Sequence, residues 1–260
     1  MTPFPATLTR RTHKLLAALA ILACAAVAQA GTDADARARA FLDGVDDLYR
    51  GETSHGTITM RIKTAHWSRE LKVESWSKGK DRSLMRILSP KKEKGTATLR
   101  VEKNIWNYLP KVGRVIKIPS SMMGGSWMGS HFTNDDLVRE SRMADDFDFS
   151  VTFEGKRDGK EVVEITCLAR EEAAVVWGKI VVEVTPAKIP LRMRYFDEDM
   201  VLARTMTFGD VKKIGERMLP TVMLVQPADK PEEHTEVIYD DLTFGVALPD
   251  DFFSLRTLKR

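Results

Sequence analysis

The sequence has few of the residues that build disulfide or metal sites. Its 260 residues include two cysteines and five histidines. Cys24 lies in the leader described below, so Cys167 is left without a partner, and no internal disulfide is expected. One histidine, His13, also lies in this leader. The remaining four show no H-x-H or H-x-x-x-H spacing: His55, His66, His131 and His234. The sequence therefore predicts no metal site, and Cys167, on an alternating run, is expected to be a small buried hydrophobe.

Motifs of common enzymes are also missing. Gly124-Gly125 is not followed by Lys-Ser or Lys-Thr, as a phosphate-binding loop requires. Residues 125–129 read G-S-x-x-G and not G-x-S-x-G, so they form no nucleophile elbow. Ser130, His131 and Asp135 are close in sequence, but triads are assembled in space. We predict no enzyme activity and no cofactor, with a lipid-modifying enzyme using His131 and the paired aspartates as the weakest alternative.

The N-terminus has the features of an export signal. Arg10, Arg11 and Lys14 precede the apolar run 15–27, and Ala28-Gln29-Ala30 is an A-x-A cleavage site. We expect residues 1–30 to be a signal peptide and residues 31–260 a single domain in the periplasm. A lipoprotein anchor at Cys24 is the less favoured alternative, because 21–24 only roughly resembles a lipobox.

Removal of this leader leaves no excess of charge. Its three charged residues are all basic, so the 40 Lys and Arg of the chain fall to 37, equal to the 37 Asp and Glu. A general affinity for nucleic acid or for anionic membranes therefore has no support.

The remaining sequence begins with a helical pattern and continues with strands. Phe41, Leu42, Val45, Leu48 and Tyr49 form an apolar stripe at helical spacing, and Gly51 ends it. Period-two alternation then predicts strands around the following ranges: 58–62, 71–73, 82–88, 97–101, 104–109, 114–118, 147–153, 161–169, 175–184, 191–197, 202–208, 218–225 and 235–242. We expect eleven or twelve antiparallel strands in one large sheet, curled or partly closed.

A second short helix is expected after residue 132. Thr133 is a candidate N-cap, and Asp136 is placed to complete a capping box with it. Two short helices cannot fill the inside of so long a sheet. Either side chains fill it completely or a cavity remains, and periodicity alone favours the filled interior.

Residues 120–132 read SSMMGGSWMGSHF, which fits no ordinary element. Glycine gives backbone freedom and methionine makes adaptable apolar contacts. We therefore expect a lid over an apolar cavity, hinged at Gly124, Gly125 and Gly129. Its lining and gating residues are predicted from this segment and from nearby aromatic residues: Trp76, Trp106, Tyr108, Met122, Met123, Trp127, Met128 and Phe132.

Several stretches together resemble the bacterial outer membrane lipoprotein-sorting protein family, which is related to the periplasmic lipoprotein carrier LolA and its receptor LolB. They are W-N-Y-L-P-K at 106–111, the run from Ser120 to Leu137, V-V-W-G-K-I at 175–180 and Q-P-A-D-K-P at 226–231. The resemblance covers residues 41–258. It implies an unclosed β-barrel of about eleven strands, with a few helices over the opening and a cavity for acyl chains.

The resemblance also implies a function. We expect a periplasmic carrier that binds lipid or lipoprotein acyl chains and transfers them toward the outer membrane, together with an inner-membrane transporter of the RND or ABC type. The alternative is an adaptor that docks on such an exporter through the same apolar segment. Both the carrier and the adaptor hypothesis predict a monomer that binds no nucleic acid.

Overall fold

The computed structural model describes residues 36–139, 143–173 and 175–260, and the predicted signal peptide lies outside these ranges. The described strands are β1 (Thr53–Lys63), β2 (Ser68–Lys78), β3 (Arg82–Ser89), β4 (Ala97–Val101), β5 (Asn104–Leu109), β6 (Arg114–Lys117), β7 (Phe147–Arg157), β8 (Lys160–Ala169), β9 (Lys179–Val184), β10 (Pro190–Phe196), β11 (Leu202–Ile214), β12 (Arg217–Pro227) and β13 (His234–Phe244). The helical elements are residues 36–50, η1 (Pro110–Val112), η2 (Ser120–Met122), η3 (Trp127–Gly129), α2 (Asp136–Arg139), α3 (Met143–Asp146) and α4 (Leu255–Leu258).

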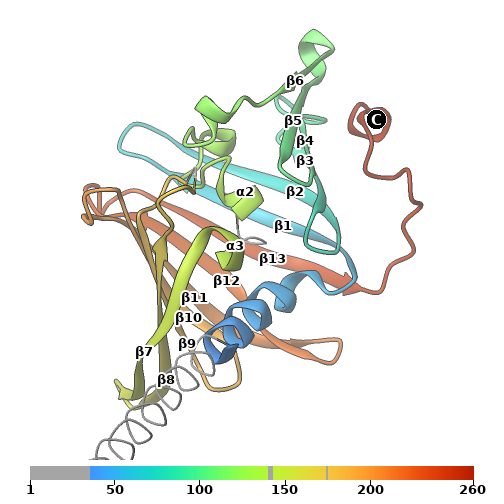
Figure 1. Ribbon diagram of the computed structural model, residues 1–260. Helices are drawn as coiled ribbons and strands as arrows, with labels where there is room; N and C mark the ends of the chain where they lie inside the picture. The colour runs from blue at the N-terminus through green and yellow to red at the C-terminus, as the bar shows by residue number, and fades with distance from the viewer. Residues whose placement is uncertain (1–35, 140–142, 174) are drawn as a thin grey trace, which may run out of the picture.

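All thirteen strands belong to one antiparallel sheet that does not close. Strands consecutive in sequence pair with each other except β6 and β7, and β1 also pairs with β13, so β6 and β7 are the two edges. The sheet curls strongly around the N-terminal helix and the short helices α2 and α3 (Figure 1). The predicted unclosed barrel is confirmed. It has thirteen strands, one over each of the thirteen predicted ranges, where a total of eleven or twelve was expected; the short run at 114–118 pairs with β5 as β6.

The inner face of the sheet forms the main core with the N-terminal helix. Alternating residues such as Met60, Ile165 and Val182 point inward and are at most 3% exposed. The predicted stripe of the helix packs on them through Phe41 and Leu42, among others. Gly51 ends the helix in the left-handed conformation, with φ of 57°, which glycine adopts without strain.

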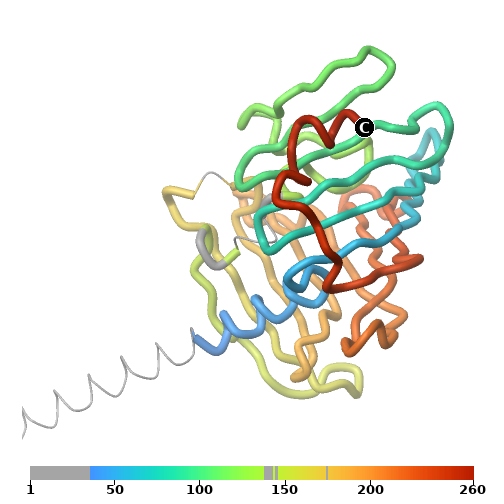
Figure 2. The backbone as a smooth tube through the Cα atoms, turned by 90° about the vertical axis from the view of Figure 1, so that its right-hand side faces the viewer, coloured from blue at the N-terminus to red at the C-terminus, as the bar shows by residue number. Residues whose placement is uncertain are grey.

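The outer face of the sheet carries a second, smaller core. Residues 245–260 run along the outside of β2–β5, where Phe253 and Leu258 pack on Leu84 and Leu99 (Figure 2). α4 begins at Ser254, whose hydroxyl accepts the Thr257 main-chain N–H at 3.3 Å. One half of the sheet therefore has apolar residues on both faces.

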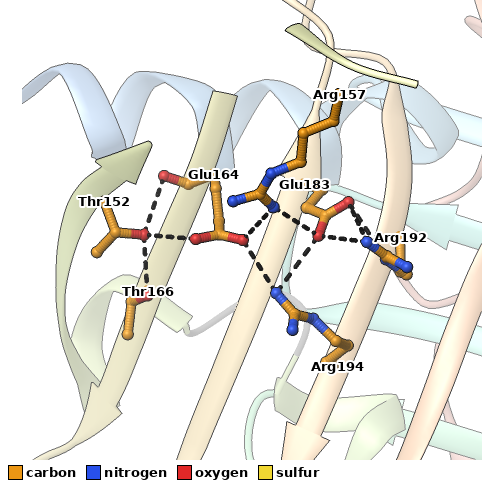
Figure 3. Close-up of polar contacts among 7 residues, drawn as sticks. All are labelled: Thr152, Arg157, Glu164, Thr166, Glu183, Arg192 and Arg194. Atoms are coloured by element: carbon orange, nitrogen blue, oxygen red, sulfur yellow. Dashed lines mark hydrogen bonds and ion pairs between the residues drawn. The ribbon is translucent and has the colours of Figure 1, made fainter. Parts of the chain in front are cut away.

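The outer face of β7–β10 is held by ion pairs instead (Figure 3). Arg157 and Arg194 both contact Glu164 and Glu183, and Arg192 makes a bidentate contact with Glu183. The two glutamates are well covered, with side chains 12% and 6% exposed. Because the contacts join all four strands, this network clamps the half of the sheet that ends at the edge strand β7.

Glu164 makes the stability of this network dependent on pH. Burial raises the pKa of its carboxyl, but hydrogen bonds from Arg157 and Thr152 outweigh burial and hold the pKa below its ordinary value of 4.5. Such a group stabilises the fold fully above its ordinary pKa, and the contribution is lost as the pH falls through the lowered folded value.

We predict that Glu164→Gln lowers the free energy of unfolding at pH 7 by about 1–3 kcal/mol, as expected for a buried charged hydrogen-bond acceptor. The difference from the parent should shrink as the pH falls below 4.5. Urea unfolding at several pH values measures both effects. Glu161→Gln on the same strand, where the side chain is 57% exposed, is the control and should change stability by less than about 0.5 kcal/mol. An unchanged parent-to-variant difference at pH 3 would contradict the assignment.

Candidate functional site

The connection between the two edge strands crosses the opening of the barrel (Figure 1). It runs from the end of β6 at Lys117 to the start of β7 at Phe147, and it contains residues 120–132, here called the Gly/Met segment, followed by α2 and α3. A chain that joins the two free edges of an unclosed barrel must pass over the gap between them. Its position therefore follows from the topology of the sheet.

The Gly/Met segment is anchored at its apolar side chains. Trp127 is 3% exposed, and its indole N–H donates to Thr98 Oγ1 on β4 at 3.1 Å. The Trp127 main-chain N–H donates to the Phe132 carbonyl at 2.8 Å, which closes the segment into a small loop. Met128 and Gly129 adopt the left-handed conformation, with φ of 51° and 69°. In the form described here, the predicted lid is folded onto the inner face.

A buried ion pair fastens the start of α2 to the sheet. Arg204 on β11 donates to both carboxylate oxygens of Asp136, at 2.6 and 2.7 Å, and also to the His131 carbonyl at 2.8 Å. Its guanidinium lies over the rings of Trp177 and Tyr195, 4.6 and 4.2 Å from their centroids. The two charged side chains are 5% and 7% exposed, so water competes little for this contact.

The predicted capping box at the same place is confirmed. The Thr133 main-chain N–H donates to Asp136 Oδ2 at 2.7 Å, and the Asp136 main-chain N–H donates to Thr133 Oγ1 at 3.2 Å. The Asp136 carboxylate thus accepts hydrogen bonds both from the turn before the helix and from the buried Arg204. Loss of this one carboxylate would remove both contacts.

His131 links the segment to β13 and does not assemble a triad with its neighbours in sequence. Its Nδ1 lies 2.8 Å from Thr235 Oγ1, and its Nε2 lies 3.2 Å from Glu233 Oε2. A hydrogen bond from the Ala65 main chain, followed by the one from His131, lowers the pKa of Glu233. Ser130 donates its hydroxyl to the Trp127 carbonyl at 2.7 Å instead. Within the described ranges, no group of three or more His, Cys, Asp and Glu side chains could hold a metal ion.

A cavity of about 180 Å³ lies between the inner face, the N-terminal helix and the Gly/Met segment. Its apolar lining comes from the helix, the sheet and the crossing connection: Leu42, Val45, Tyr49, Ile58, Met60, Trp76, Met85, Trp127, Phe132, Leu137, Met143, Met193, Tyr195, Phe208, Met223, Val237, Tyr239 and Leu242. The polar lining consists of Asp46, Arg50, Ser54, Ser75, Ser77, Ser83 and Asp136. The site is thus mainly apolar, with few polar groups.

The structure divides the eight predicted lining residues among three places. Trp127 and Phe132 line the cavity. Trp76 borders it as well, although its ring stacks on His55 and packs against Phe252 at the outer face.

The other five predicted residues lie away from the cavity lining. Trp106 and Tyr108 belong to the outer core, because their strand positions point to the opposite face from Thr98. Met128 is half-buried against the main core, Met123 is half-buried, and Met122 is 54% exposed. Of the predicted hinges, Gly124 and Gly125 are exposed, and Gly129 takes the conformation given above.

Sequence reasoning missed the five methionines that line the cavity: Met60, Met85, Met143, Met193 and Met223. The total of twelve methionines was a signal, and the alternation of Ile58, Met60 and Ile62 showed only that Met60 shares the apolar face of its strand. It also missed Arg204, whose role depends on a partner 68 residues away in the chain. Cys167 is fully buried as expected, and burial raises its pKa to about 12.

We predict that Asp136→Ala lowers the free energy of unfolding by about 3–5 kcal/mol, because it leaves Arg204 buried without its carboxylate. Chemical denaturation measures the change. Asp148→Ala removes an exposed ion pair with Arg170 and serves as the control, with a loss below about 1 kcal/mol. Combining Asp136→Leu with Arg204→Met should recover part of the loss; additive losses would show that the pair is not coupled.

Comparison with known proteins agrees with this architecture. A family model described as "-like: Uncharacterized protein" matches residues 79–260. No curated protein matches the chain. Within the described ranges, no helix has both the length and the apolar character needed to cross a bilayer.

Three solved structures share the fold over most of the chain. A domain described as an outer membrane lipoprotein-sorting protein domain, from Vibrio parahaemolyticus, is 24% identical with a TM-score of 0.74, covering 86% of this chain and 100% of that one. A DUF1329 family protein from Desulfovibrio piger is 21% identical with a TM-score of 0.79, covering 86% and 99%. A LolA superfamily protein from Nitrosomonas europaea is 19% identical with a TM-score of 0.72, covering 85% and 98%.

These similarities confirm the resemblance drawn from the sequence. The chain belongs to the family that the matching model describes, and its fold is that of the LolA superfamily and of outer membrane lipoprotein-sorting domains.

Proposed function

We propose that this protein is a periplasmic carrier that binds lipid or lipoprotein acyl chains in the cavity and transfers them toward the outer membrane. The observation that carries the proposal is the apolar cavity under the connection that crosses the barrel opening. The names of the structural neighbours, a lipoprotein-sorting domain and a LolA superfamily protein, support the same class of cargo. A carrier of this kind catalyses no reaction.

The energetics of acyl chains explain why such a cavity is needed. Each methylene withdrawn from water contributes about 0.8 kcal/mol, so one long chain exposed in an aqueous compartment costs on the order of 10 kcal/mol. The cavity of about 180 Å³ is smaller than the roughly 300–1,000 Å³ of common ligand pockets. Uptake therefore requires the lining to move, and five flexible methionines allow it to adapt at little cost.

The proposed location is the periplasm, which the protein reaches by export with removal of residues 1–30. The mature chain would then carry equal numbers of acidic and basic residues. A carrier without net charge is not held at anionic leaflets by long-range attraction, so it can diffuse between the two membranes. An inner-membrane transporter of the RND or ABC type is the proposed donor or acceptor of the cargo.

Native mass spectrometry tests the carrier directly. The protein, expressed with its leader and purified from periplasm without detergent, should retain a lipid or acylated cargo whose mass identifies its class. An apo mass, together with no uptake of a fluorescent fatty-acyl probe, would contradict the proposal.

We also predict that filling the cavity blocks uptake. Met223→Trp on β12 places a larger side chain in the lining and should reduce fluorescent acyl-probe binding at least about tenfold, while overpacking costs about 1–3 kcal/mol of stability. Met218→Trp on the same strand is the matched control, because Met218 is 48% exposed and lies outside the lining. Equal binding by both variants and the parent would place the probe elsewhere.

The adaptor alternative rests on a different observation. Val112, Ile116 and Met122 expose 61%, 45% and 54% of their surfaces near the edge strand β6. Exposed apolar side chains of this kind suit a protein contact with an exporter. If the adaptor is correct, Met122→Ser should weaken binding to the purified exporter while Met223→Trp has no effect. If the carrier is correct, Met223→Trp should weaken lipid binding while Met122→Ser has no effect on it.

A further inference from the structure

The polar groups of the cavity lining gather mainly at one end. Ser54, Ser77 and Ser83 are direct neighbours across β1, β2 and β3 in the strand registers Ser54↔Ser77 and Ser77↔Ser83. Asp46 and Arg50, one turn apart near the end of the N-terminal helix, line the same cavity. At this end, a helix and three strands thus replace the apolar lining by hydroxyls and a charged pair.

One oxygen at this end has an unused hydrogen-bonding capacity. Asp46 Oδ1 accepts from Arg50 Nε at 2.8 Å. Oδ2 is buried, and no donor of the described residues lies within hydrogen-bond distance of it. Lys80 Nζ lies 4.0 Å from Oδ2, beyond hydrogen-bond distance. Since the Asp46 side chain is only 7% exposed, bulk water does not readily replace the missing donor, and an unsatisfied buried acceptor is costly.

The charge of Asp46 is already balanced. Arg50 contacts it directly, and Lys80 lies beside it while also contacting Asp43 at 2.6 Å. What Oδ2 lacks is therefore a hydrogen-bond donor and not a further positive charge. A ligand carboxylate at this position would face another carboxylate, and a ligand with acceptors alone would leave Oδ2 unsatisfied.

We propose that the cavity selects amphiphiles whose polar end carries a neutral hydrogen-bond donor, a hydroxyl or an amide N–H, which donates to Asp46 Oδ2. The alkyl part lies along the methionine lining, where Met60 and Met223 come from strands of the same curled sheet. This assignment rests on the proposed carrier function and adds to it the chemistry of the cargo at the polar end of the cavity.

The test compares short amphiphiles of equal length. Displacement of N-phenyl-1-naphthylamine from the purified mature protein is measured with 1-decanol, N-methyldecanamide, the methyl ether of decanol and decanoate. At least one of the two donors should bind about tenfold more tightly than the ether, as one buried hydrogen bond supplies, and decanoate should bind most weakly. The better of the two donors distinguishes a lipid hydroxyl from an acyl amide as the source.

Asp46→Asn separates this contact from general hydrophobicity. Its Oδ1 still accepts from Arg50, so the amide nitrogen replaces Oδ2 and becomes a donor. The alcohol and the ether can both accept from it, so the preference for the alcohol should disappear. Asp47→Asn on the same helix is the control: the Asp47 side chain is 61% exposed and lies outside the lining, so the preference should persist.

The outcomes distinguish the two proposals. If no amphiphile binds, both the carrier and this inference fail. If all bind, but the alcohol and the amide are no tighter than the ether, or Asp46→Asn keeps the preference, the inference alone fails. Should Asp46→Asn not fold, as judged by circular dichroism, the ratio of donor to ether in the parent protein decides the question.

Discussion

A sheet that does not close leaves a gap between its two edge strands, and the rest of this structure depends on how that gap is covered. Here the strands pair in sequence order and β1 meets β13, so β6 and β7 become the free edges. Only one connection joins these two strands in the chain, and it has to pass over the opening. The apolar side chains of the Gly/Met segment lie at that crossing, which explains why Trp127 and Phe132 are buried there.

The cover is held by polar contacts as well as by its buried apolar side chains. Asp136 and Arg204 form a buried pair, Trp127 donates to Thr98, and His131 contacts Thr235. Buried polar contacts are directional, so they define one closed arrangement. The methionines of the lining are not directional, so they accept a range of shapes. The proposed carrier would combine the two: a cover with a defined closed position above a lining that can adapt.

The two faces of the sheet solve different packing problems. Along β2–β5 the outer face is apolar, and residues 245–260 cover it, whereas along β7–β10 the outer face is polar and held by the Glu164 and Glu183 network. Because the two faces are packed differently, residues on the same pair of strands can belong either to the outer core or to the inner face. Trp106 stands opposite Leu99 on the outer face, while the neighbouring pair Thr98 and Asn107 belongs to the inner face, where Thr98 holds Trp127.

Local patterns in the sequence determined the parts of this protein that depend on local physics. Period-two alternation predicted the strands, helical spacing predicted the helix that ends at Gly51, and the Thr133 and Asp136 spacing predicted the capping box. These features arise from backbone geometry within a few residues, so the sequence alone contains them. Only the tertiary structure decided which face each aromatic residue serves, because Trp76 and Trp106 alternate as regularly as inner-face residues do. It also decided that Asp136 pairs with Arg204 and that Asp46 lines the same cavity as the serines of three strands, because both arrangements bring together segments far apart in the chain.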